Sequence, residues 1–141
     1  MKALLDINVV MDVLLDRPRL SEASAVIMAQ VELSKITGVL CATSITTIHY
    51  LISKACGKQA GEEVIKTLLQ LYEIAAVNQT VLMQAQTMGF RDYEDSVQYT
   101  AARSVNAEVI ITRNTKDFTK AELPVVTPEE FIMHYPSVQM V

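Results

Sequence analysis

Short apolar segments alternate with longer amphipathic segments along most of the chain, and this alternation restricts the fold more than any other feature. Strands that are separated by helices pair in parallel and are covered on both faces. The pattern therefore predicts one α/β domain over 1–141, with three α/β/α layers and a short, mostly parallel central sheet. The expected strands are 2–5, 39–42, 74–77, 108–112 and 125–127, and the expected helices are 8–15, 21–36, 43–55, 59–72, 81–88, 92–105 and 128–133.

The composition supports a folded domain and restricts its ligands. Half of the 141 residues are apolar, which is enough to build a core. The net charge of -4 argues against a broad basic surface for nucleic acid. If nucleic acid is the substrate, local Lys and Arg residues and bound metal have to offset its phosphate charge.

Two cysteines and the absence of long apolar runs bear on localisation. Cys41 and Cys56 lie in apolar sequence, so both are expected to be buried free thiols, as in a reducing cytoplasm. No apolar run approaches the roughly 18 residues of a membrane helix. The chain also reaches Asp6 before any signal-peptide apolar region forms. We therefore expect a cytoplasmic protein that has no membrane partner.

Polar side chains follow three of the expected strands. Asp6 follows the first strand, Ser44 follows the second, and Asn114 and Asp117 follow the strand at 108–112. In an open parallel sheet, ligands bind outside the carboxyl ends of the strands. Oxygen ligands select Mg²⁺ or Mn²⁺ over softer metals. The sequence therefore predicts a site for a hard cation at this edge of the sheet.

Each acid also has a structural explanation. Asp92 and Asp95 fit an N-cap and the third residue of a helix, as in a capping box, and both suit the helix dipole. Asp95 also borders the face that packs on the sheet, where a carboxylate is costly unless it is paired or bound to metal. Asp6 fits a helix cap, and Asp117 fits a turn. These residues alone leave both interpretations open. Ser21, and either Thr43 or Ser44, are expected to cap the helices that follow them.

Three segments resemble one known family. They read LLDINVVMDVLLDRP, DYEDSVQY, and VIITRNTKDF followed by VVTPEEF. In this order they resemble a PIN domain, in particular the compact bacterial branch that includes VapC-type toxins. The likeness extends over nearly the whole chain. It implies a PIN-like fold and an endoribonuclease that hydrolyses RNA phosphodiester bonds with Mg²⁺ or Mn²⁺.

The resemblance also assigns roles by position. The catalytic and metal-binding acids would be Asp6, Asp95 and Asp117, and Asp92 matches a further acid in similar members. Where the family usually has a glutamate, this chain has His49. Imidazole is a softer ligand than carboxylate and suits Mg²⁺ poorly. His49 is therefore expected either to support the site or to be a helix residue that is hydrogen-bonded at the domain edge.

The positive charge of a bound metal ion would promote hydrolysis of the RNA backbone in two ways. A metal ion lowers the pKa of its bound water and neutralises the phosphate. Asn8, Ser44 and Asn114 are expected to support the site, the last two by orienting the water or by binding the metal through it. Basic residues that flank the acids are expected to bind the RNA backbone, with an ordinary solvated surface as the alternative. They are Arg91, Arg113, Lys116 and Lys120.

Partners and rival functions complete the expectations. The helices at 20–36 and 59–72 have wide apolar faces, which would serve a homodimer or an antitoxin peptide if the chain is the toxin of a toxin–antitoxin pair. One rival function is a Mg²⁺-dependent phosphatase, which normally needs an acid where this chain has Asn8. The other is a catalytically weak PIN-like binding module, which His49 favours.

Overall fold

The computed structural model describes residues 1–135, and its strands and helices alternate as the sequence predicts. Residues 136–141 of the expected domain lie outside the described residues. The strands are β1 (Lys2–Leu5), β2 (Thr37–Cys41), β3 (Glu73–Ala75), β4 (Val109–Ile111) and β5 (Val125–Val126). The helices are α1 (Ile7–Leu14), α2 (Ser21–Glu32), α3 (Ala42–Cys56), α4 (Lys58–Leu71), α5 (Gln79–Gln86), α6 (Tyr93–Ser104) and α7 (Pro128–His134), with one 3-10 helix, η1 (Thr115–Phe118).

The five strands form one sheet in the order β3-β2-β1-β4-β5, and each neighbouring pair is parallel. β1 lies at the centre, where Leu4 pairs with Val39 of β2 and with Ile110 of β4. Because all strands point the same way, the segments that follow β1, β2 and β4 leave the sheet at one edge. We call this the carboxyl edge.

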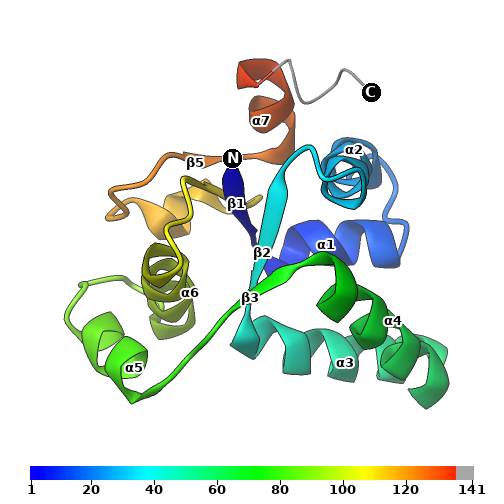
Figure 1. Cartoon of the computed structure of the whole chain (residues 1–141), viewed down its shortest axis with the longest axis horizontal. Coiled ribbons are helices and arrows are strands. Elements are labelled where there is room, and N and C mark those ends of the chain that lie inside the picture. Colours follow the sequence, from blue (N-terminus) through cyan, green and yellow to red (C-terminus); the bar gives the residue numbers. More distant parts are fainter. Residues whose placement is uncertain (136–141) are drawn as a thin grey trace.

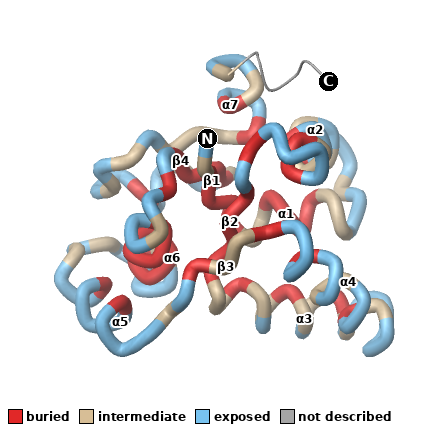
Figure 2. The backbone as a smooth tube through the Cα atoms, viewed as in Figure 1, coloured by how far each residue is buried: buried red, intermediate tan, exposed pale blue. Residues whose placement is uncertain are grey.

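Helices cover both faces of the sheet (Figure 1). Successive residues of a strand point to opposite faces, and β1 follows this rule. Ala3 and Leu5 join a core with α1, α2, α3, α4 and α7, whereas Leu4 joins a second core with α5, α6 and η1. The buried residues accordingly follow the strands and the inner sides of the helices (Figure 2). The predicted three-layer α/β/α arrangement is confirmed.

The predicted element ends agree with the structure to within two residues, apart from the end of α2. This helix ends at Glu32, four residues before its predicted end, because Ser34 adopts a φ of 59° and turns the chain toward β2. The predicted cap at Ser21 is wrong, since the N-cap is Leu20 and makes no side-chain cap hydrogen bond.

Two further expectations near α3 are also wrong. β2 runs directly into α3, so the N-cap is Cys41, and Thr43 and Ser44 lie inside the first turn instead of capping it. Cys41 is buried as expected, but Cys56 is exposed, because it is the last residue of α3 and points away from the core. Within residues 1–135, each helix is too short or too polar to cross a lipid bilayer.

Candidate metal centre at the carboxyl edge

Asp6 is held in one orientation at the carboxyl edge. It is only 5% exposed and lies between β1 and α1. Its Oδ1 accepts a hydrogen bond from the Ile7 N–H at 2.7 Å, and its Oδ2 accepts one from the Thr112 hydroxyl at 2.7 Å. Asp6 is therefore both the N-cap of α1 and a carboxylate fixed at the sheet edge, so the two interpretations of this residue are compatible.

Thr112 is a site residue that the sequence reasoning did not single out. It is fully buried, and its Oγ1 donates to Asp6 and accepts from the Asn114 N–H at 3.0 Å. The signal for it was the register of the sheet. Leu5 pairs with Ile111, so the next residue on each strand, Asp6 and Thr112, leave the sheet side by side.

Asp92 and Asp95 are in different environments although they are one helical turn apart. Asp92 is exposed and is the N-cap of α6, where its Oδ1 accepts from the Glu94 N–H at 2.8 Å and the Asp95 N–H at 3.3 Å. The capping interpretation of Asp92 is confirmed. Asp95 is half-buried, and its side chain faces the other acids.

The pKa of Asp95 shows that these acids share one region. It is raised from 3.8 to about 7, with burial as the largest cause. The negative charges of Asp92, Asp6, Asp117 and Glu94 raise it further. Like charges have this effect only at short range. Residues at the end of β1, in α6 and in η1, which are far apart in the sequence, therefore contribute to one electrostatic field.

The chemistry of these side chains fits a hard cation, although the acids do not form a closed cage. Within residues 1–135, no three His, Cys, Asp or Glu side chains are grouped closely enough to hold a metal ion. Carboxylate oxygens are nevertheless the ligands that Mg²⁺ and Mn²⁺ prefer. The charges of Asp6 and Asp117 repel that of Asp95, as the raised pKa of Asp95 shows. A bound cation would offset that repulsion.

The loop after β4 carries Asn114 and Asp117. Both are exposed, and the Asp117 N–H donates to the Asn114 carbonyl at 3.0 Å at the start of η1. Asn8 supports the same loop, because its Oδ1 accepts from the Arg113 N–H at 3.4 Å. The Asn8 side chain thus attaches the backbone of this loop to the corner between β1 and α1.

Arg113 does not have the role that its position in the sequence suggested. Its guanidinium forms ion pairs with Asp12 and with Glu129, the latter at 3.2 Å, and its side chain is only 19% exposed. We therefore assign it an internal role in place of contact with RNA. Asp12 is its fully buried partner, and the sequence reasoning missed it. The other basic residues near the site are exposed: Arg91, Lys116 and Lys120.

His49 and Ser44 lie on α3, the helix that follows β2. Ser44 is buried in the first turn, whereas His49 is half-buried in the middle of the helix. Within residues 1–135, the His49 side chain makes no hydrogen bond or ion pair, so its expected hydrogen bond at the domain edge is not seen. A role for His49 at the metal site stays a prediction.

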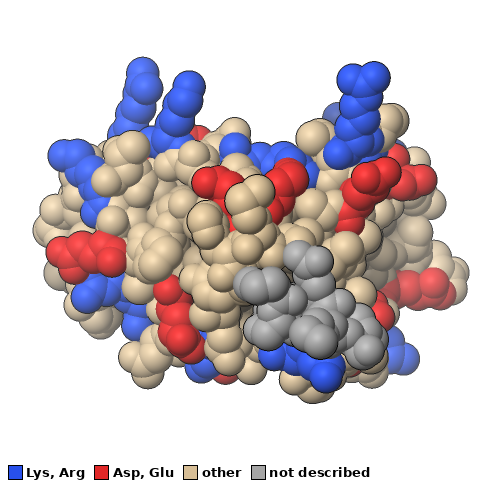
Figure 3. Space-filling view, turned by 90° about the horizontal axis from the view of Figure 1, so that it is seen from above, with Lys and Arg blue, Asp and Glu red and all other residues tan. Residues whose placement is uncertain are grey.

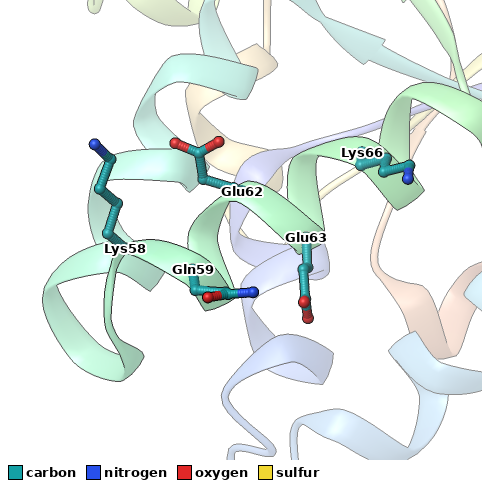
Figure 4. Close-up of a pocket in the computed structure, with 5 residues that line it drawn as sticks. All are labelled: Lys58, Gln59, Glu62, Glu63 and Lys66. Carbon is teal, nitrogen blue, oxygen red and sulfur yellow. The ribbon is translucent and has the colours of Figure 1, made fainter.

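An open cavity of about 320 Å³ borders the acidic turn of α6. It is lined by Thr43, Thr46, Thr47, Leu82, Tyr93, Glu94 and Val97. A larger open cavity, of about 580 Å³, lies along α4 and contains none of the predicted site residues (Figure 4). Its lining comes from a single helix and carries charges of both signs: Lys58, Gln59, Glu62, Glu63 and Lys66. We assign it no function.

Charged side chains of both signs are mixed on one face of the molecule. On the face seen in Figure 3, Lys and Arg side chains are interspersed with Asp and Glu, and neither sign dominates the coloured part. Non-specific binding to a phosphate backbone depends on a basic surface. The coloured part of this face therefore carries no continuous basic patch.

Comparisons with known proteins identify the family. Residues 2–116 match the model of the PIN domain. Ribonuclease VapC1 of Aquifex aeolicus (strain VF5) is 29% identical over 136 residues, which cover 92% of this chain and 92% of that protein.

Solved structures agree with this fold. VapBC-1 from nontypeable Haemophilus influenzae matches with a TM-score of 0.69 and 18% identity, over 92% of this chain and 99% of that chain. A toxin-antitoxin complex from Klebsiella pneumoniae matches with a TM-score of 0.66 and 22% identity, over 89% of this chain and 97% of that chain. The family model covers most of the chain, and the fold agrees with it. The chain therefore belongs to the PIN domain family.

Proposed function

We propose that the chain is a Mg²⁺- or Mn²⁺-dependent endoribonuclease and the toxin of a toxin–antitoxin pair. The observation that carries the proposal is the raised pKa of Asp95, to which the charges of Asp6 and Asp117 contribute from other elements. Helix capping explains the position of Asp6 but not why the charges of Asp6 and Asp117 both act on the half-buried Asp95. The similarity to a ribonuclease over 92% of the chain supports the choice of substrate.

The residues of the site would have three roles: metal binding, orientation of the water, and contact with the RNA backbone. Asp6, Asp95 and Asp117 would bind the metal, with Asp92 as a further acid beside them. The metal, when bound, would lower the pKa of a water and offset the phosphate charge. Thr112 keeps the Asp6 carboxylate turned toward the site through its 2.7 Å hydrogen bond. Supporting roles would fall to Asn114 and Ser44 at the water, and to Arg91, Lys116 and Lys120 at the RNA backbone.

An assay of RNA cleavage tests this function directly. We expect a single-stranded RNA to be cut when Mn²⁺ is present and to stay intact when EDTA removes the metal. A phosphomonoester should release no phosphate under the same conditions, because Asn8 occupies the position at which such phosphatases carry an acid. If phosphate is released and the RNA stays intact, the chain is a phosphatase. If neither substrate reacts, the binding-module alternative holds.

Metal binding should stabilise the protein more at high pH than at low pH. Asp95 has a pKa of about 7 without metal, so it is mostly protonated at about pH 6 and mostly ionised at about pH 8. A proton on Asp95 competes with the metal, and a ligand that binds only the folded state raises the melting temperature. We expect Mn²⁺ to raise the melting temperature clearly more at about pH 8, as measured by differential scanning fluorimetry. Equal shifts at both pH values would contradict this.

This chain has an apolar groove that would suit the proposed antitoxin partner. An open cavity of about 440 Å³ lies between α1, α2 and α4 and is lined mainly by apolar side chains, among them Val13, Met28, Val64 and Leu71. An amphipathic segment of a partner would bury its apolar face there. Solved relatives of this fold include toxin-antitoxin complexes, which supports a partner of this class. Hydrogen exchange on a purified complex would then show protection over α2 and α4.

We further propose a homodimer through the face that α3, α5 and α6 share. Tyr50 is 60% exposed, Met83 59% and Tyr93 47%, and large apolar groups this exposed are typical of interfaces. The change Met83→Glu should shift the chain from dimer to monomer, because it places a charge in the apolar contact. Light scattering after gel filtration measures the mass, with Met133→Glu on α7, also exposed, as the control. A wild-type monomer would contradict the proposal.

A further inference from the structure

Asp12 and Arg113 form a buried ion pair next to the candidate metal centre. Asp12 is 0% exposed, so its charge is stable only because it is paired. The Nε of Arg113 donates to Asp12 Oδ2, Ser24 Oγ donates to the same oxygen at 3.4 Å, and Arg17 Nη1 donates to Oδ1 at 3.4 Å. Arg113 also binds Glu129 on α7 and the Leu20 carbonyl at the start of α2. The pair therefore joins three helices to the loop after β4.

The contacts of this loop with α1 follow one another along both segments. The Thr112 hydroxyl binds Asp6, and the Arg113 N–H binds Asn8. The Arg113 side chain then reaches Asp12, which is one turn after Asn8 on the same face of α1. The Thr112–Asp6 contact is the most deeply buried of the three, and the Arg113–Asp12 contact is the ion pair among them. Together these contacts set where the loop leaves the sheet, and the loop carries Asn114 and Asp117.

We propose that Asp12 and Arg113 are positioning residues for the metal-binding loop, an inference that rests on the proposed function. Neither residue touches the metal or the RNA. Arg113 fixes the backbone between Thr112 and Asp117, and so fixes the Asp117 carboxylate relative to that of Asp6. Groups that contact metal ligands and orient them, without binding the metal, typically contribute 10- to 100-fold to metal affinity. Loss of the Asp12–Arg113 pair is expected to lower Mn²⁺ affinity about tenfold or more.

The decisive variant removes both charges. Changing Asp12→Leu and Arg113→Met together leaves no unpaired charge in the core, and such replacements are often neutral for stability. We expect the double variant to fold, to bind Mn²⁺ about tenfold more weakly in calorimetric titration, and to exchange its loop amides faster. The relevant amides are those of Arg113, Asn114 and Asp117, measured in the metal-free protein. The Ile110 amide, which donates to the Pro124 carbonyl inside the sheet, should exchange as in the wild type.

A matched control separates positioning from general stability. Arg17→Met removes the other charged partner of the same Asp12 carboxylate, but Arg17 lies between α1 and α2 and makes its ion pair away from the loop. It should leave both Mn²⁺ affinity and loop exchange unchanged. If the double variant does not fold, Arg113→Lys keeps the charge, loses the guanidinium contacts, and should shift both readouts in the same direction.

The outcomes distinguish this inference from the proposed function. Wild-type affinity and wild-type loop exchange in the double variant would overturn the positioning role, as would an equal effect of Arg17→Met. If the wild type binds no Mn²⁺, the proposed function fails, and the exchange of the loop amides in the metal-free protein still decides whether Arg113 fixes the loop.

Discussion

Replacement of Asp95 by asparagine is expected to remove most RNA cleavage and at the same time to raise the stability of the metal-free protein. Loss of one group that stabilises charge in a transition state commonly lowers the rate by roughly 100- to 1,000-fold, and we expect a loss of this size for Asp95→Asn. The measurement is the initial rate of RNA cleavage with Mn²⁺ at about pH 8. Asp6→Asn should lower the rate to a similar degree.

The gain in stability follows from the sign of the pKa shift. The pKa of Asp95 in the folded protein, about 7, lies above its ordinary value of 3.8, so the folded state binds the proton more tightly than the unfolded state. The ionised carboxylate therefore destabilises the fold, increasingly from about pH 4 and fully above about pH 7. Asparagine has no charge and removes this penalty. Solvent screens a half-buried group, so a rise in melting temperature of roughly 2 °C is expected at about pH 8, and little or none at about pH 4.

The control for both readouts is Glu62→Gln, which removes an exposed acid on α4. It should leave cleavage and melting temperature as in the wild type. Two results would contradict the role of Asp95. One is an Asp95→Asn protein that cleaves RNA at the wild-type rate. The other is an Asp95→Asn protein that melts below the wild type at about pH 8, which would mean that the carboxylate stabilises the fold.

Replacement of Arg113 by methionine is expected to be the most destabilising single change considered for this chain. It leaves the Asp12 carboxylate, which is 0% exposed, without its main partner. Breaking a buried ion pair from one side typically costs 3–5 kcal/mol, and we expect about 3 kcal/mol because Arg17 still contacts Asp12 at 3.4 Å. The measurement is the free energy of unfolding in urea.

Comparison of Arg113→Met with the double variant is more informative than the single variant alone. Adding Asp12→Leu to Arg113→Met removes the unpaired charge, so most of the lost stability should return. Arg17→Met alone should cost no more than about 1 kcal/mol, because its side chain is 40% exposed and its pair with Asp12 is screened. If Arg113→Met costs less than Arg17→Met, the buried pair is not what holds the loop, α1 and α2 together.

The fold could be predicted from the sequence because its signals are local. Each strand is a short apolar run and each helix has its own apolar spacing, so most boundaries were found to within two residues. The caps were harder. Ser21 has the chemistry of an N-cap, but Leu20 takes that position without a side-chain bond. Ser44 looked like a cap for the same reason. However, β2 runs directly into α3, so the last residue of the strand, Cys41, takes the N-cap position.

The site could be predicted only in part, because some of its contacts join distant positions. The direction of a parallel sheet was enough to place Asp6 at the same edge as the loop after β4. Helical spacing indicated that Asp95, unlike the N-cap candidate Asp92, borders the face that packs on the sheet, but only the structure shows that burial and the other acids raise the pKa of Asp95. The pair of Asp12 and Arg113 spans 101 positions, and nothing local marks either residue as buried.

Anomalous scattering from crystals soaked in Mn²⁺ tests the central claim most directly. The account predicts a strong manganese peak among the carboxylates of Asp6, Asp95 and Asp117, with the side chains drawn closer together than in the metal-free protein. Crystals of Asp95→Asn should show a weak peak or none at the same place. A wild-type crystal with no manganese at this edge of the sheet, or with manganese bound only elsewhere, would contradict the account.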